Sequence, residues 1–133
     1  MRFKNPTVVN DMVRLESENQ RLYALLCAAD GYVRDQSGHK DICITSVHRA
    51  TNKHSVHAHW RGADIRIGLP VRGDEATEID VGEARALCDW LEECFCYDES
   101  HVVYRFELFV DKQGAYEAKS HIHVQVKGYE PWS

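Results

Sequence analysis

Long apolar runs are missing from this sequence. Nowhere do about 18 consecutive apolar residues occur, and the segment from Met1 to Pro6 lacks the apolar stretch of a secretory signal. We therefore expect no membrane insertion, no signal peptide and synthesis in the cytoplasm.

Glycine and proline are scarce, and cysteine follows no metal or disulfide pattern. The 133 residues include eight glycines and three prolines, while 44% are hydrophobic and 28% are charged. These proportions exclude a disordered or collagen-like chain, and the length predicts one domain over residues 1–133, expected to be a monomer. The five cysteines form an odd set without a C-x-x-C pair, which favours reduced thiols over a disulfide framework.

Positive charge is also in deficit. Sixteen Lys and Arg residues stand against 21 Asp and Glu residues, which gives a net charge of −5, and no run of basic residues occurs. A nucleic-acid-binding surface needs a basic patch to neutralise phosphates. Nucleic acid is therefore not expected as a partner.

The spacing of apolar residues predicts a mixed α+β domain. Apolar residues over Met12–Ala29 recur at helical spacing and Gly31 follows, which predicts one helix of about five turns. A second helix is predicted from the capping-box pair Asp80 and Glu83 to about Tyr97. The predicted strands are Ile42–Val47, Ala63–Ile67, Val102–Val110 and Ile122–Val126.

Histidine is abundant, and six of the eight residues fall in two short regions. One region contains His57 and Asp64, and the other contains His121 and His123. Because alternate residues of a strand face the same way, the last two share a face opposite the apolar side chains. Imidazole and carboxylate groups are typical ligands of a hydrolytic zinc ion, which leaves a fourth position to water. For either H-x-H pair taken alone, His57 with His59 or His121 with His123, a solvated surface or loop remains the simpler interpretation.

Two segments carry a resemblance to a known family. Ser55–Asp64 resembles the S-x-H-x-x-G-x-A-x-D signature of the zinc peptidases that include D-Ala-D-Ala carboxypeptidases, phage L-alanyl-D-glutamate endolysins and the hedgehog signalling domain. Tyr116–Lys127 is similar to the hedgehog zinc segment. The resemblance implies a Zn²⁺ site with His57, Asp64 and His123 as its ligands.

Two residues between the first two ligands depart from the family pattern. Trp60 and Gly62 occupy positions that are small in the family, and the bulk of Trp60 makes the local turn unusual. Gly62 is expected to let the loop fold back, so that Asp64 opens a strand beside His57.

The resemblance also implies catalytic roles. Ile44–Arg49 resembles a strand-ending T-S-x-x-R segment, whose arginine would bind substrate, here Arg49. Glu117 lies six residues before the third ligand, where the hedgehog-like variant places its acid, whereas peptidases of the group often place it at the position of Ser120. Glu117 would be the general base, and His121 would stabilise the oxyanion. Six residues of straight strand span about 20 Å, so this role requires the chain to turn before His121.

The implied fold is hedgehog/DD-peptidase-like, with a small antiparallel sheet that carries the zinc and packs with two main helices. The implied function is a zinc metallopeptidase, either a D-Ala-D-Ala carboxypeptidase or an L-alanyl-D-glutamate endopeptidase, that hydrolyses peptidoglycan stem peptides. A phage endolysin acting at the cell wall would suit the absence of a signal peptide.

Two other hypotheses remain open. The chain could be a non-catalytic zinc-containing binding module of hedgehog-like fold, or a virion or phage-assembly protein in which the fold only packs. Zinc content separates the last hypothesis from the others, and peptidoglycan hydrolysis separates an enzyme from a binding module.

Overall fold

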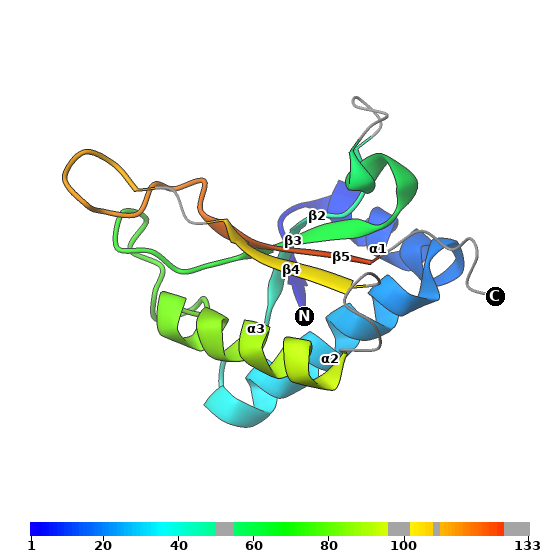
Figure 1. Ribbon diagram of the computed structural model, residues 1–133, viewed down its shortest axis with the longest axis horizontal. Coiled ribbons are helices and arrows are strands. Elements are labelled where there is room, and N and C mark those ends of the chain that lie inside the picture. Colours follow the sequence, from blue (N-terminus) through cyan, green and yellow to red (C-terminus); the bar gives the residue numbers. More distant parts are fainter. Residues whose placement is uncertain (50–54, 96–101, 108–109, 127–133) are drawn as a thin grey trace.

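The computed structural model describes residues 1–49, 55–95, 102–107 and 110–126, arranged as Figure 1 shows. Its helices are α1 (Pro6–Glu18), α2 (Gln20–Ser37), the short 3-10 helix η1 (Val56–His59) and α3 (Val81–Cys94). Its strands are β1 (Arg2–Phe3), β2 (Cys43–Ser46), β3 (Gly62–Arg66), β4 (Val102–Glu107) and β5 (His121–Val126).

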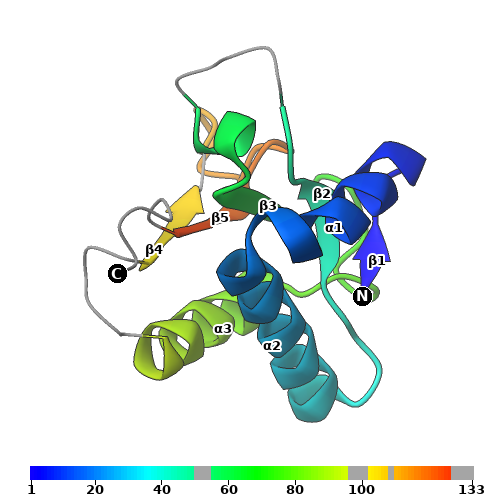
Figure 2. The same ribbon diagram turned by 90° about the vertical axis from the view of Figure 1, so that its right-hand side faces the viewer.

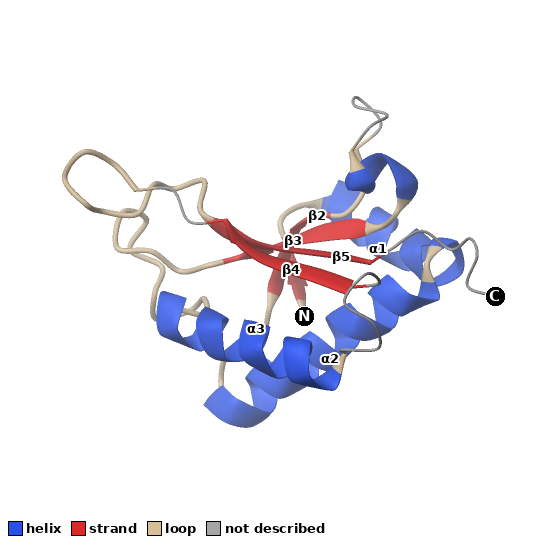
Figure 3. Cartoon of the chain, viewed as in Figure 1, coloured by secondary structure: helices blue, strands red, loops and turns tan. Residues whose placement is uncertain are grey.

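The strands form one sheet in the order β1-β2-β3-β5-β4. The neighbouring pairs β2–β3, β3–β5 and β5–β4 are antiparallel, whereas β1 runs parallel to β2. Helices α2 and α3 lie side by side on one side of the sheet (Figures 1, 2 and 3). The α+β prediction is therefore confirmed.

The core lies between these two helices and the sheet. Ile122, Val124 and Val126 alternate along β5 and face the core, while His123 is buried on the opposite face of the strand. Between the helices, the rings of Tyr32 and Trp90 stack with centroids 4.6 Å apart. The fully buried helix side chains include Leu22, Leu25, Leu26, Leu87 and Leu91.

The helix predicted over Met12–Ala29 is wrong, because the structure has two helices there. Asn19 is only 1% exposed and lies between the two helices. It ends α1 and caps α2, because its side chain accepts a hydrogen bond from the backbone N–H of Leu22 (3.2 Å). An asparagine side chain competes in this way with helix propagation. The predicted stop at Gly31 is also wrong, since α2 continues to Ser37, and its C-cap Gly38 adopts φ 75°. The described chain thus has three α-helices where two main helices were expected.

The other predicted elements agree more closely with the structure. The capping box at the start of α3 is confirmed, since the Asp80 and Glu83 side chains each accept from the other's backbone N–H. α3 ends at Cys94 with Phe95 as its C-cap, short of the predicted end near Tyr97, which lies outside the described residues, as does part of the predicted strand after Glu107. β1 was not predicted, because two residues carry no periodicity.

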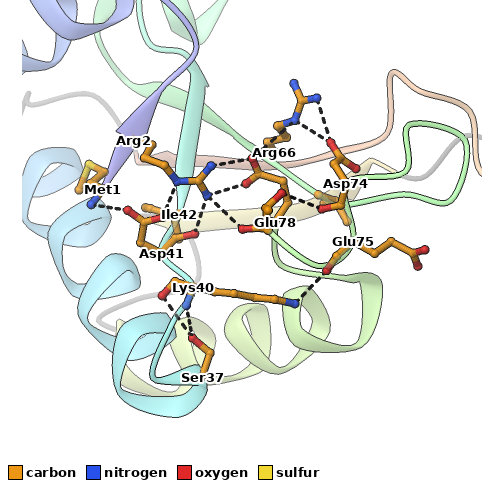
Figure 4. Close-up of polar contacts among 12 residues, drawn as sticks. Met1, Arg2, Ser37, Lys40, Asp41, Ile42, Arg66, Asp74, Glu75 and Glu78 are labelled. Atoms are coloured by element: carbon orange, nitrogen blue, oxygen red, sulfur yellow. Dashed lines mark hydrogen bonds and ion pairs between the residues drawn. The ribbon is translucent and has the colours of Figure 1, made fainter.

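A polar network joins β1 to the loops on the edge of the sheet (Figure 4). The Arg2 guanidinium donates to Asp41 (2.6 Å) and, through two nitrogens, to both carboxylate oxygens of Glu78 (2.7 and 2.6 Å). The hydrogen bond to Glu78 raises the Arg2 pKa above its ordinary value. Arg66 pairs with Asp74 (2.9 Å) beside it. This Arg2 network fastens the short first strand to the rest of the sheet.

Candidate metal centre

Asp64 and His123 face each other across two paired strands. The register of β3 against β5 places the two residues directly opposite, and the Asp64 Oδ1 lies 2.9 Å from the His123 Nδ1. The residues are 5% and 8% exposed. Cross-strand partners of an antiparallel pair project to the same face, so the pairing itself brings the carboxylate to the imidazole.

His57 reaches the same carboxylate from η1. Its Nε2 lies 3.5 Å from the Asp64 Oδ1, and its Nδ1 lies 3.2 Å from the Val47 backbone oxygen. The connection to β3 passes through Trp60, which adopts φ 58°. The sequence-based assignment of the turn to Gly62 is therefore wrong, since Gly62 begins β3.

The left-handed backbone at Trp60 is unusual for a bulky residue and requires compensation by its surroundings. The His48 ring stacks on the indole at 4.2 Å between centroids, and the Arg14 guanidinium lies 5.1 Å from the indole centroid. Trp60 is 8% exposed. These contacts hold the turn that delivers His57 to Asp64.

His121 also directs a ring nitrogen at Asp64. Its Nε2 lies 3.6 Å from the Asp64 Oδ1, and its Nδ1 lies 2.8 Å from the Lys119 backbone oxygen. His57 has the same arrangement with the Val47 oxygen. A carbonyl oxygen only accepts, so the Nδ1 of each ring carries the proton. In the neutral form, the Nε2 of both rings then presents a lone pair to the same carboxylate oxygen.

Two acceptors that face one another need a positive species between them. Either the imidazoles are protonated, or a cation lies among the nitrogens and the Asp64 oxygen. His123 fits the same scheme, because its Nε2 donates to the Gln125 Oε1 (2.8 Å) and its Nδ1 is left for Asp64 or for a cation. Hydrogen bonds of this kind to the far ring nitrogen are typical of metal-binding histidines.

The ligand atoms of His57, Asp64 and His123 all lie within 4.8 Å of one another. All three residues are buried, and the group could hold a metal ion. It is the only such group in the part of the chain that the structure describes. The residues therefore fit the ligand set expected from the sequence.

The neighbours of Asp64 keep its carboxylate ionised. Burial alone would raise the pKa of this carboxyl, but when the imidazoles are protonated, hydrogen bonds from His123 and His57 and the charge of the nearby rings hold it well below its ordinary value. The Arg49 guanidinium donates to the Asp64 Oδ2 (2.6 Å) and to the Ser46 Oγ (2.8 Å). Arg49 was predicted to bind substrate, and in the structure it orients the carboxylate while its side chain stays 52% exposed.

Glu117 lies at a turn before β5. The Ser120 N–H donates to the Glu117 backbone oxygen (3.0 Å), so the chain is not a straight strand there, which was the condition for a base at this position. The Glu117 carboxylate lies 3.7 Å from the Lys119 Nζ and is 42% exposed. Ser120 is 3% exposed. The catalytic role of Glu117 remains a prediction.

Sequence reasoning missed Gln125 and the Val47 and Lys119 carbonyls, which orient the three imidazoles. Gln125 could have been found, since it follows His123 by two residues on the same strand face. The carbonyl partners carry no sequence signal, because any residue supplies a backbone oxygen.

Among the described residues, no helix has the length and apolar character needed to cross a membrane. Comparisons of this chain with protein-family models, with curated proteins and with solved structures found no match.

Proposed function

We propose that this chain is a zinc-dependent peptidase with a hedgehog/DD-peptidase-like fold. The observation that carries the proposal is the convergence of several imidazole nitrogens on one buried carboxylate oxygen, with the far nitrogens occupied by acceptors. Imidazole and carboxylate ligands in a group of three match catalytic zinc sites, which keep a position for water or substrate.

His57, Asp64 and His123 would hold the ion. A bound Zn²⁺ would supply Lewis acidity, polarising a carbonyl group and lowering the pKa of water toward about 7. Gln125 and the Val47 carbonyl hold the His123 and His57 rings in place, and would keep them oriented toward the ion. Arg49 keeps one oxygen of Asp64 engaged, so that the other faces the imidazoles.

The remaining roles would belong to Glu117 in the turn before β5 and to His121, the first residue of β5. Glu117 would accept the proton of the attacking water and pass it to the leaving amine, after leaving its ion pair with Lys119. His121 would hydrogen-bond the oxyanion through Nε2, which requires a proton on both ring nitrogens because Nδ1 faces a carbonyl.

The substrate class rests on the sequence resemblance. It favours stem peptides of peptidoglycan, cleaved by a D-Ala-D-Ala carboxypeptidase or an L-alanyl-D-glutamate endopeptidase, and an endolysin is a fitting context. Resemblance to a family is weak evidence for a substrate, so the test must identify the cleaved bond from the reaction products.

The test measures metal and products on the same protein. Protein purified without chelator should contain about one equivalent of zinc and convert muropeptides to products that mass analysis identifies. His123→Ala should lose both, whereas His39→Ala removes an exposed imidazole outside the group and should lose neither. Less than about a tenth of an equivalent of metal, without recovery on adding zinc, would contradict the site.

A non-catalytic zinc-containing binding module is the second candidate. The pairing of Glu117 with Lys119 favours it, because a base must reach the reacting water. Full zinc occupancy without hydrolysis of any muropeptide would support this candidate over the peptidase.

A further inference from the structure

The residues that follow β2 hold two of the proposed metal ligands. The Val47 backbone oxygen lies 3.2 Å from the His57 Nδ1, and the Arg49 backbone N–H donates to the His57 backbone oxygen (3.4 Å). The Arg49 guanidinium donates to the Asp64 Oδ2. Val47 and Arg49 therefore contact the ligands directly, and one residue, His48, lies between them in the sequence.

His48 stacks on the turn that links these two ligands. Trp60 lies between η1, which carries His57, and β3, which carries Asp64. The rings of His48 and Trp60 are almost parallel, with 10° between their planes and 4.2 Å between their centroids. The Arg14 guanidinium of α1 lies 5.1 Å from the indole centroid. Side chains from two other segments therefore converge on this indole.

The turn needs this support because of its backbone conformation. A bulky L-residue rarely adopts a φ near +60°, since its Cβ then approaches the following carbonyl oxygen. Trp60 adopts φ 58° and is only 8% exposed. Such a conformation persists only where the surroundings hold it, and a flat ring packed on the indole does so through stacking. A relaxed turn would change the direction of the chain and move His57 relative to Asp64.

We propose that His48 is a positioning residue of the metal centre. By stacking on Trp60, it supports the left-handed turn and so keeps the His57 ring directed at the other ligands. The inference rests on the metal site of the proposed function and not on its peptidase activity. The family pattern has a small residue at the position of Trp60, which offers no ring to stack on, so the resemblance implies no such role.

Zinc affinity is the first measurement, by competition titration with a chromophoric chelator. His48→Ala removes the stacked ring and should weaken zinc binding about tenfold, at the lower end of the losses seen when a residue that orients a metal ligand is removed. His48→Phe keeps a flat ring without its nitrogens and should restore the affinity to within about twofold. His39→Ala is the matched control, because it removes an exposed imidazole that lies outside the stack, and it should leave the affinity unchanged.

Arg14→Gln tests the second contact of the indole. It removes a guanidinium from the Trp60 ring, and the Arg14 side chain is 65% exposed. A cation–π contact at an exposed site is weak, so zinc binding should weaken only about two- to fivefold. The order of the losses should therefore be His48→Ala first and Arg14→Gln second.

The second measurement needs no zinc. Long-range ¹H–¹⁵N correlation spectra at pH 8, where an ordinary histidine is neutral, report which ring nitrogen carries the proton. In the zinc-free wild type, His57 should carry it on Nδ1, which faces the Val47 oxygen. His48→Ala should lower the share of this tautomer. The tautomer of His121, whose Nδ1 faces the Lys119 oxygen, should stay unchanged and serves as the internal control.

Three outcomes would overturn the inference. Unchanged zinc affinity in His48→Ala, or a loss in His48→Phe as large as in His48→Ala, would contradict support by stacking. Equal tautomer changes at His57 and His121 would show a general effect on folding and contradict a positioning role. A wild type that binds no zinc, but whose His57 tautomer depends on His48, would support the positioning role and reject the zinc site.

Discussion

The polar clusters around Arg2 and around Asp64 differ in how their hydrogen bonds are completed. In the Arg2 network, donors are paired with acceptors, because one guanidinium donates hydrogen bonds to both Asp41 and Glu78. Around Asp64, three imidazoles direct ring nitrogens at the same oxygen. In the Arg2 network, folding alone pairs the donors with acceptors. Around Asp64, the facing acceptors are paired only when protons are added or a cation binds.

This contrast separates a structural cluster from a candidate site. A network that satisfies its own groups contributes stability and needs no ligand. A buried group with surplus acceptors costs free energy until a cation arrives. Changes in the Arg2 network should therefore alter folding, and changes around Asp64 should alter metal binding and activity.

The largest expected effect is on turnover. Glu117→Gln keeps the size of the side chain but cannot accept a proton, so it should leave zinc bound and reduce muropeptide hydrolysis by about 10²- to 10⁴-fold. Ser120→Ala should change the rate little. A large loss from Ser120→Ala, or wild-type rates in Glu117→Gln, would mean that the base is placed wrongly.

The next effect concerns the hydrogen bond that orients His123. Gln125→Leu removes the acceptor 2.8 Å from the His123 Nε2 and should weaken zinc binding about 10- to 100-fold in a competition titration with a chromophoric chelator. Gln125→Glu keeps a carboxyl oxygen as acceptor and should restore the affinity. If Gln125→Leu binds zinc like the wild type, the far nitrogen of His123 does not orient the ring.

A change in the Arg2 network should act on stability alone. Arg2→Met keeps an apolar stem but leaves Glu78, whose side chain is 8% exposed, without its bidentate partner. We expect the free energy of unfolding, measured with urea on the zinc-loaded protein, to fall by about 2 kcal/mol. Zinc affinity should not change, and a parallel loss of zinc would show that the two clusters are coupled.

The same contrast explains what the sequence could predict. The group of His57, Asp64 and His123 was expected from the two segments that resemble the zinc peptidases, and the structure brings the three residues together as a group that could hold a metal ion. The break at Asn19 was not, since it depends on a buried side chain that caps the next helix.

Backbone conformations set by tertiary contacts were also beyond sequence reasoning. The positive φ falls on Trp60 and not on Gly62, because stacking with His48 supports a conformation that propensity alone disfavours. The contact of Arg49 with the Asp64 carboxylate also carries no sequence signal, since it depends on the fold, while the predicted role of Arg49 in substrate binding stays a prediction.

The smallest expected effect is a change in acid sensitivity. Burial alone would raise the Asp41 pKa, but the hydrogen bond from Arg2 helps to lower it below its ordinary value of 3.8. A carboxyl with a lowered pKa in the folded state stabilises the fold above the pKa of the unfolded chain, and this stabilisation is lost as the pH falls through the folded pKa. The free energy of unfolding, measured with urea from pH 6 down to pH 3, should therefore fall less steeply in Arg2→Met than in the wild type. Arg14→Met is the control, because its partner Glu18 is exposed. Parallel curves for Arg2→Met and the wild type would show that Arg2 does not hold the charge of Asp41.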